Sequence, residues 1–170
     1  MDFTIRSATI EDSEDINRMI LELAECEKIA DQVLITQTDL EQDGFSENPF
    51  FHALIAEVPE ENKTKDGHTK IGFSMYFYIY SWKGRAVFME DLDVMPDFRG
   101  KGIGKALMCK VARLGRAAGC TQLKFTVLNW NKSALDFYQN QGSFDLTSEQ
   151  GYHYMCFQGN AFQKMADRGC

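Results

Sequence analysis

The fold is decided by the stretch Asp93-Val94-Met95-Pro96-Asp97-Phe98-Arg99-Gly100-Lys101-Gly102-Ile103-Gly104, in which a turn with three glycines joins an apolar strand to a helix. The first N–H groups of such a helix have no partner within it, and the helix dipole adds partial positive charge there. Glycines let the backbone approach a ligand closely, and Arg99 and Lys101 add full charges. The stretch therefore predicts a phosphate site. One face of the helix carries apolar residues at the helical period, namely Ile103, Leu107, Val111, Leu114 and Ala118.

The spacing of the glycines separates this loop from the two common nucleotide-binding loops. The run G-K-G-I-G lacks the last spacing of the dinucleotide fingerprint, and no Gly-Lys-Ser/Thr closes a P-loop. The segment Arg99-x-x-Gly102-x-Gly104 instead resembles the pyrophosphate loop of the GCN5-related N-acetyltransferases, which bind acetyl-coenzyme A. The alternative is a helix that begins after a glycine turn and binds no ligand.

Length and composition are typical of a globular protein with one domain, here residues 1–170. The chain has 170 residues, of which 44% are hydrophobic and 25% are charged. The net charge of −7 argues against nucleic acid as a partner and favours a cationic substrate, although solubility alone explains it equally well. No apolar run is long enough to span a membrane, and the N-terminal residues lack the apolar region of a signal peptide.

The cysteines are odd in number and lack metal-like spacing, so we expect reduced thiols in a cytoplasmic protein. They are Cys26, Cys109, Cys120, Cys156 and Cys170. The histidines are scattered along the chain, so no metal site is expected.

The hydrophobic pattern predicts a mixed α/β (α+β) domain around one twisted mixed sheet of about seven strands flanked by helices. Helices are expected from the capping motif Thr9-x-x-Asp12 to near residue 28, at 37–43, after Gly102, at 133–140 and in a short tail. Strands are expected at 3–6, 51–58, 71–80, 85–94, 123–128, 143–146 and 152–157.

This order of elements resembles the single acyl-CoA N-acyltransferase domain of the GCN5-related N-acetyltransferases (GNAT), over nearly the whole chain. Further segments resemble one branch, the spermidine/spermine acetyltransferases and the related thialysine N-epsilon-acetyltransferases. They are Asp43-Gly44-Phe45, Asn48-Pro49-Phe50-Phe51-His52, Glu90-Asp91, Trp130-Asn131, Phe137-Tyr138, Asp145-Leu146 and Glu149-Gln150-Gly151. Three more favour the thialysine enzymes: Glu25-Cys26-Glu27-Lys28, Ser81-Trp82-Lys83-Gly84-Arg85 and Cys156-Phe157-Gln158-Gly159. The polyamine enzymes tend to carry acidic residues at the positions of Ser81 and Gln150, which argues against specificity for long polyamines.

Acetyl transfer to an amine first requires that the ammonium lose its proton, because a primary amine with a pKa of about 10 is protonated at neutral pH. The resemblance implies that Glu90 anchors the cation and accepts this proton through water. On a regular strand Glu90 and Asp91 point to opposite faces, so only one of them, alone or with Asp93, faces a given site. The alternative for Glu90 is an exposed carboxylate at a strand edge.

The second requirement is an acid for the departing thiolate of coenzyme A. The resemblance places Tyr138, on the helix after Asn131, at the position of the family's general acid; the alternative is a packed helix tyrosine. It also implies that the strand ending at Val94 separates from the one beginning at Leu123, so that the gap receives the pantetheine arm and backbone N–H groups reach the thioester carbonyl. The expected cofactor-binding residues are Leu92, Asp93, Val94, Arg99, Gly100, Lys101, Gly102, Ile103, Gly104, Lys105, Asn131, Lys132, Ser133 and Ala134.

The resemblance also implies a set of amine-binding positions, to which Trp82 adds a possible cation–π contact. For Trp82 the alternative is packing on its own hairpin, and Asn131 and Ser133 are equally suited to capping a helix. No setting that would activate the thiol of Cys26 is visible, so direct transfer in a ternary complex is expected. The expected substrate-binding residues are Cys26, Glu27, Trp82, Glu90, Lys124, Phe125, Thr126 and Gln150.

These observations predict an acetyl-CoA-dependent N-acetyltransferase for a small cationic amine, either a thialysine- or lysine-like amine or a short polyamine. A polyamine-specific enzyme, a protein lysine acetyltransferase and a non-catalytic acyl-CoA-binding module are the alternatives. The resemblance implies a homodimer, and the strands after Gly142 with the apolar tail are its expected interface. The alternative for the tail is core packing within one chain; its apolar residues are Phe157, Ala161, Phe162 and Met165.

Overall fold

The computed structural model describes residues 2–168, so Met1, Gly169 and Cys170 lie outside the described part. The chain divides into two compact units, with the boundary between Thr126 and Val127. Each unit is described by itself.

The first unit is built on a five-stranded mixed sheet in the order β1-β2-β3-β4-β5. Its strands are β1 (Thr4–Ser7), β2 (His52–Glu57), β3 (Lys70–Ser81), β4 (Gly84–Val94) and β5 (Gln122–Phe125). Neighbouring strands are antiparallel except for β4 and β5, which are parallel and enclose the crossover helix. This arrangement confirms the predicted mixed α/β class.

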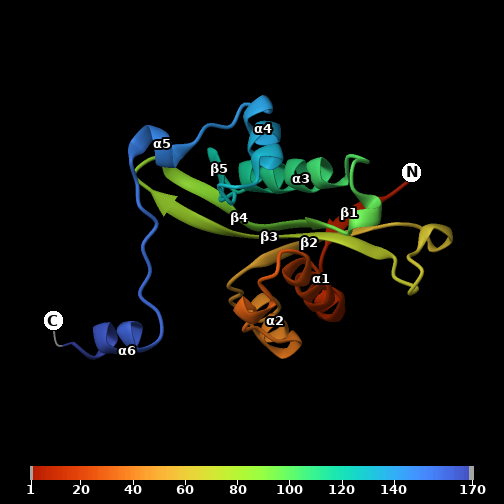
Figure 1. The fold of residues 1–170 in the computed structure, drawn as a ribbon, viewed down its shortest axis with the longest axis horizontal. Coiled ribbons are helices and arrows are strands. Elements are labelled where there is room, and N and C mark those ends of the chain that lie inside the picture. Colours follow the sequence, from red (N-terminus) through yellow and green to blue (C-terminus); the bar gives the residue numbers. More distant parts are fainter. Residues whose placement is uncertain (1, 169–170) are drawn as a thin grey trace. The chain divides into compact units, whose positions relative to one another are not determined.

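Helices cover both faces of this sheet: α3 (Ile103–Ala117) lies on one face, and α1 (Ser13–Cys26) and α2 (Gln37–Gly44) lie on the other (Figure 1). Short 3₁₀ turns occur at Ile10–Asp12, Ala30–Gln32, Glu60–Asn62 and Pro96–Phe98. The predicted cap before α1 is present, because the Asp12 carboxylate accepts a hydrogen bond of 2.7 Å from the backbone N–H of Thr9.

Two apolar clusters hold the layers together, one on each face of the sheet. Neighbouring residues of β2 illustrate the division, since Leu54 packs on the α3 side and Ile55 on the α1 side, and both are fully buried. The α3 side also buries Ile103, Leu107 and Val111, as the helical period predicts. The α1 side buries Ile16, Met19, Leu40 and Phe73.

The second unit contains α4 (Lys132–Asn140), α5 (Leu146–Gln150) and α6 (Asn160–Asp167). The strands expected at 143–146 and 152–157 are absent from it, so the sheet has five strands rather than about seven. Asp145 explains the first difference, because its carboxylate accepts hydrogen bonds from the N–H groups of Thr147 (3.0 Å) and Ser148 (3.4 Å) and so starts α5. The residues at 152–157 pair with no strand of the described chain, and apolar alternation without such a partner does not make a strand.

None of the helices within residues 2–168 has the length and apolarity needed to cross a membrane.

Candidate active site

The candidate site begins at an irregularity in β4. On β3, Met75 pairs with Asp91 and the next residue, Tyr76, pairs with Met89, so Glu90 is an extra residue in the ladder. The resulting β-bulge breaks the side-chain alternation, because Met89 packs on the α3 side whereas Asp91 lies opposite Met75, which packs on the α1 side. The expectation that Glu90 and Asp91 point to opposite faces rested on regular alternation, and the bulge removes that basis.

Carboxylates from β4 and from the end of α1 come together on the α1 side. Burial, together with the negative charges of Glu90, Asp93 and Glu27, raises the pKa of Asp91 to about 6. Burial and the negative charges of Glu22 and Glu27 likewise raise the pKa of Asp93, to about 6, although the positive charge of Arg99 opposes the shift. Residues at the end of α1 and residues near the end of β4 therefore share one strongly negative region.

This acidic region has the properties of a site for a cation that must lose a proton. A carboxylate whose pKa is close to neutral accepts a proton more readily than an ordinary one, which suits a general base. Glu90 is exposed at the bulge, next to Asp91. Glu90 and Asp91 are therefore the candidates for this base.

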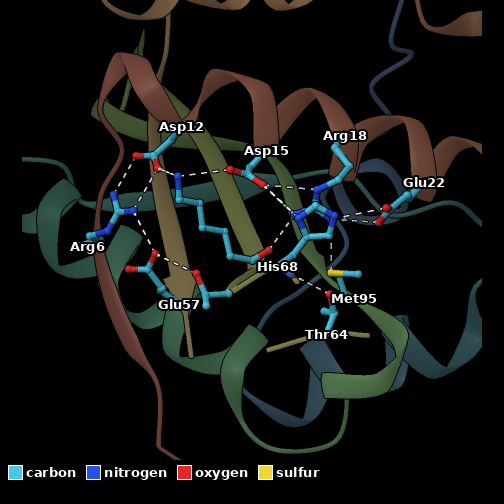
Figure 2. Close-up of polar contacts among 11 residues, drawn as sticks. Arg6, Asp12, Asp15, Arg18, Glu22, Glu57, Thr64, His68 and Met95 are labelled. Atoms are coloured by element: carbon cyan, nitrogen blue, oxygen red, sulfur yellow. Dashed lines mark hydrogen bonds and ion pairs between the residues drawn. The ribbon is translucent and has the colours of Figure 1, made fainter. Parts of the chain in front are cut away.

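A network of ion pairs fixes α1 against the sheet (Figure 2). Asp12 is buried and accepts hydrogen bonds from Arg6 at 2.7 and 3.0 Å. The Lys70 ammonium lies 2.8 Å from Asp12 and 3.2 Å from Asp15. The charges compensate one another, so the start of α1 is held to β1 and β3.

Arg18 continues this network toward the acidic region. Its guanidinium donates to the Lys70 carbonyl at 2.9 Å and lies 3.4 Å from the Glu22 carboxylate and 3.5 Å from the Met95 sulfur (Figure 2). Because Met95 directly follows β4, Arg18 ties Glu22 to the end of the strand that carries Asp93. The position of the α1 carboxylates is thus set by packing and not by a flexible loop.

The glycine loop after β4 has the geometry of an anion site. Arg99 Nε donates to the Val94 carbonyl at 2.7 Å, which fixes the start of the loop. Gly100 and Gly102 have φ angles of 76° and 83°, which L side chains rarely adopt, and Gly102 caps α3. A Cβ at Gly102 would meet no atom within 4 Å, so the backbone there is open to a ligand.

The charges around the N-terminus of α3 are cationic. Lys101 and Lys105 are exposed, no acidic residue lies in the first turn, and the Lys101 ammonium sits 5.6 Å from the centroid of the Phe98 ring. The helix dipole and these cations act in the same direction. Residues Arg99–Lys105 therefore fit the pyrophosphate of a coenzyme A thioester.

The edge of β4 that faces β5 is paired only in part. Their register ends at Met89 and Phe125, so the β4 backbone of Leu92, Asp93 and Val94 has no β5 partner. β4 continues past this point while β5 ends at Phe125, so peptide groups of β4 are left for an extended ligand. Lys124 and Phe125 are partly buried in β5, and Thr126 follows its end.

The second unit holds the proposed acid. The Asn131 side chain accepts hydrogen bonds from the Ala134 N–H at 3.3 Å and the Ser133 hydroxyl at 3.2 Å, so Asn131 caps α4. Burial raises the pKa of Tyr138, on the same helix, above its usual value. A neutral phenol that is harder to ionise is suited to carrying a proton at neutral pH.

The remaining expected residues lie at element ends. Cys26 closes α1, Glu27 caps it, and Gln150 closes α5. Trp82 is fully exposed in the turn between β3 and β4, so its side chain is not packed on its own hairpin. Glu22 was not predicted; Asp93 was expected among the cofactor-binding positions and as a possible companion of Glu90 or Asp91. Asp91 and Asp93 are two residues apart in a strand, and this spacing was the signal in the sequence that they share one face.

Comparison with known proteins identifies the family of this chain. The Acetyltransferase (GNAT) family matches residues 18–142. The thialysine N-epsilon-acetyltransferase of Sus scrofa is 44% identical over 165 residues, which cover 96% of this chain and 97% of that protein. The spermidine/spermine N(1)-acetyltransferase-like protein 1 of Homo sapiens is 37% identical over 96% of this chain, although the match covers only 24% of that longer protein.

A solved structure agrees over the full length. The integron cassette protein VCH_CASS6 from the mobile metagenome of V. cholerae superposes with a TM-score of 0.76, at 27% identity, and covers 99% of each chain. The strand order, the glycine loop at the start of α3 and these matches agree with one another. The chain therefore belongs to the GNAT family and is an N-acetyltransferase.

Proposed function

We propose that the protein transfers the acetyl group of acetyl-coenzyme A to a primary amine of a small cationic substrate. One observation carries the proposal: the acidic region around Asp91 and Asp93 lies on the strand that leads directly into the cationic loop at Arg99. An ammonium and a pyrophosphate would thus bind at opposite ends of one short segment, with the reacting atoms between them.

In the proposed reaction the ammonium first loses a proton to Glu90 or to Asp91 beside it, and the neutral amine nitrogen attacks the thioester carbonyl directly. The new C–N bond replaces the C–S bond, Tyr138 protonates the departing thiolate, and the second proton lost by the acetylated nitrogen restores the Tyr138 phenol. The unpaired β4 backbone near Leu92 and Val94 supports this scheme, because its N–H groups are suited to stabilising the negative oxygen that forms.

The substrate class is proposed from the relatives together with the charges. Thialysine or a lysine-like amine is the preferred substrate, since the 44% identical protein is named for that activity. A short polyamine such as spermidine is the second candidate, favoured by the 37% identical protein, whose name likens it to a spermidine/spermine N(1)-acetyltransferase. The acidic region suits either cation.

We also propose a cytoplasmic homodimer that needs no metal and binds neither nucleic acid nor membranes. The second unit exposes apolar side chains that an interface would cover, which supports a dimer; they are Tyr152, Tyr154, Met155, Phe157 and Phe162. Light scattering of the purified protein tests this state, and a monomer at micromolar concentration would contradict it.

The deciding experiment measures release of free coenzyme A from acetyl-coenzyme A with a panel of amines. Thialysine, lysine, spermidine, spermine and a lysine peptide are compared at equal concentrations. Preference for thialysine supports the first substrate, preference for spermidine or spermine supports a polyamine-specific enzyme, and turnover of the peptide alone indicates a protein acetyltransferase. Coenzyme A binding without turnover on any amine would leave a non-catalytic binding module.

Two variants test the assigned roles. Tyr138→Phe is expected to lower kcat by about 10²- to 10⁴-fold, the usual contribution of a positioned acid; full turnover would contradict the assignment. Glu90→Gln is expected to shift the pH profile of kcat/KM toward higher pH, because the amine must then lose its proton in solution before it can react. An unchanged profile would move the base role to Asp91.

A further inference from the structure

The two ends of the candidate site meet at an ion pair between a buried carboxylate and a half-exposed guanidinium. The Asp93 side chain is only 6% exposed, and its Oδ1 lies 3.8 Å from Nη2 of Arg99. The positive charge of Arg99 favours the ionised form of Asp93, whereas the negative charges of Glu22, Glu27 and Asp91 oppose it. Its cross-strand neighbour, Phe73, is fully buried and offers no charge.

The Arg99 side chain is bound to the backbone and is also accessible to solvent. Its Nε is bound to the Val94 carbonyl at 2.7 Å, yet its side chain is 52% exposed, so the guanidinium is accessible from the loop. A pyrophosphate at this loop would carry several negative charges next to the same guanidinium. Asp93 and the pyrophosphate therefore compete for one positive charge.

We propose that Asp93 couples the two substrates: pyrophosphate binding takes up the charge of Arg99, and Asp93 then requires the ammonium of the amine, or a proton, in its place. The inference deepens the proposed function and rests on it. Coenzyme A and the amine thus bind with positive cooperativity, and the amine binds best to the complex with coenzyme A.

The cost of an uncompensated buried charge explains the coupling. A buried carboxylate among other carboxylates is unfavourable without a cation, which agrees with the raised pKa of Asp93. When coenzyme A binds alone, Asp93 takes up a proton; when the amine follows, its ammonium replaces that proton. Linkage requires the effect to be reciprocal, so the amine strengthens coenzyme A binding by the same factor.

Calorimetric titration tests the proposal with coenzyme A and thialysine, a pair that cannot react because no acetyl group is present. Proton uptake on coenzyme A binding at pH 7 is measured in two buffers with different ionisation enthalpies. The phosphates of coenzyme A contribute equally to every variant, so the difference between variants reports on the protein. Asp97→Asn is the matched control, since Asp97 is exposed two residues before Arg99.

The unaltered protein and Asp97→Asn are expected to take up protons and to bind thialysine about 5-fold or more tightly when coenzyme A is present. Asp93→Asn should lose the extra proton uptake and most of the coupling. Arg99→Gln provides a second variant: without its cation Asp93 should hold more of its proton before coenzyme A binds, so proton uptake should be reduced even though coenzyme A binds more weakly.

Two results would overturn the inference. Equal proton uptake and coupling in Asp93→Asn, or undiminished uptake in Arg99→Gln, would refute the coupling and leave the proposed function standing. Failure of the unaltered protein to bind coenzyme A would instead refute the proposed function, and the coupling with it.

Discussion

Asp93→Asn is expected to make the protein more stable at neutral pH, although it removes a charged residue with an ion-pair partner. The folded-state pKa of Asp93 is about 6, against 3.8 for an unperturbed aspartate. Between these values the folded chain binds more protons than the unfolded chain, so stability falls as the pH rises from about 4 to about 6 and stays lower above it.

The magnitude follows from this difference. A shift of about 2 pH units corresponds to about 3 kcal/mol of unfolding free energy at pH 7, at 1.36 kcal/mol per unit. Asparagine gives up the contact to Arg99, but at 3.8 Å that contact to a half-exposed guanidinium is weak. We therefore expect a gain of about 1–3 kcal/mol at pH 7, or roughly 3–10 °C in Tm.

Urea denaturation at pH 4.5, 6 and 7.5 measures this effect. The gain of Asp93→Asn over the unaltered protein should grow across the series, whereas the exposed Asp97→Asn control should stay within about 0.5 kcal/mol at each pH. A variant less stable than the unaltered protein at pH 7.5, or a gain that does not change with pH, would refute the reasoning. The expected result would show that Asp93 lowers the stability of the unaltered protein, as the proposed coupling role allows.

Asp12→Asn should have the opposite sign and cost about 3 kcal/mol at pH 7, because it breaks a buried pair. Burial opposes ionisation of Asp12, yet hydrogen bonds from Arg6 and Lys70 hold its pKa below the usual range, so its contribution is present at neutral pH and is lost on acidification below about pH 4. Urea denaturation at pH 7 and pH 3 checks this, and a difference that grows at pH 3 would contradict it. Gly102→Ala should cost about 1–2 kcal/mol, because its φ of 83° strains an L residue. Gly104→Ala should not lower the melting temperature, since its added Cβ meets only Val94, at 3.8 Å. Equal losses of melting temperature in the two variants would contradict the role of φ.

Several parts of the fold follow from local sequence. The period of Ile103, Leu107 and Val111 predicts α3, and these residues are buried on one face of the sheet. The long aromatic run of β3 and the turn at Ser81–Gly84 predict the central hairpin. The glycine loop and its flanking cations are also local, since a strand, a turn and a helix start suffice to form the site.

The C-terminal part shows where local pattern is insufficient. The alternation at 152–157 favours a strand, but a strand requires a partner, and none exists for it in the described chain. At 143–146, the capping hydrogen bonds of Asp145 compete with strand formation and start a helix turn.

The sequence by itself determined the family, the class of fold, the anion loop and the identity of most residues proposed for the site, because each depends on neighbours within a few positions or on segments that resemble known relatives. Only the tertiary structure decided which carboxylates act together. The bulge at Glu90 places Asp91 and Asp93 on the face of α1, and the ion pairs of Arg18 hold Glu22 near them. Charges and burial depend on groups that are distant in sequence, so pKa values near 6 arise only when α1 packs against the sheet.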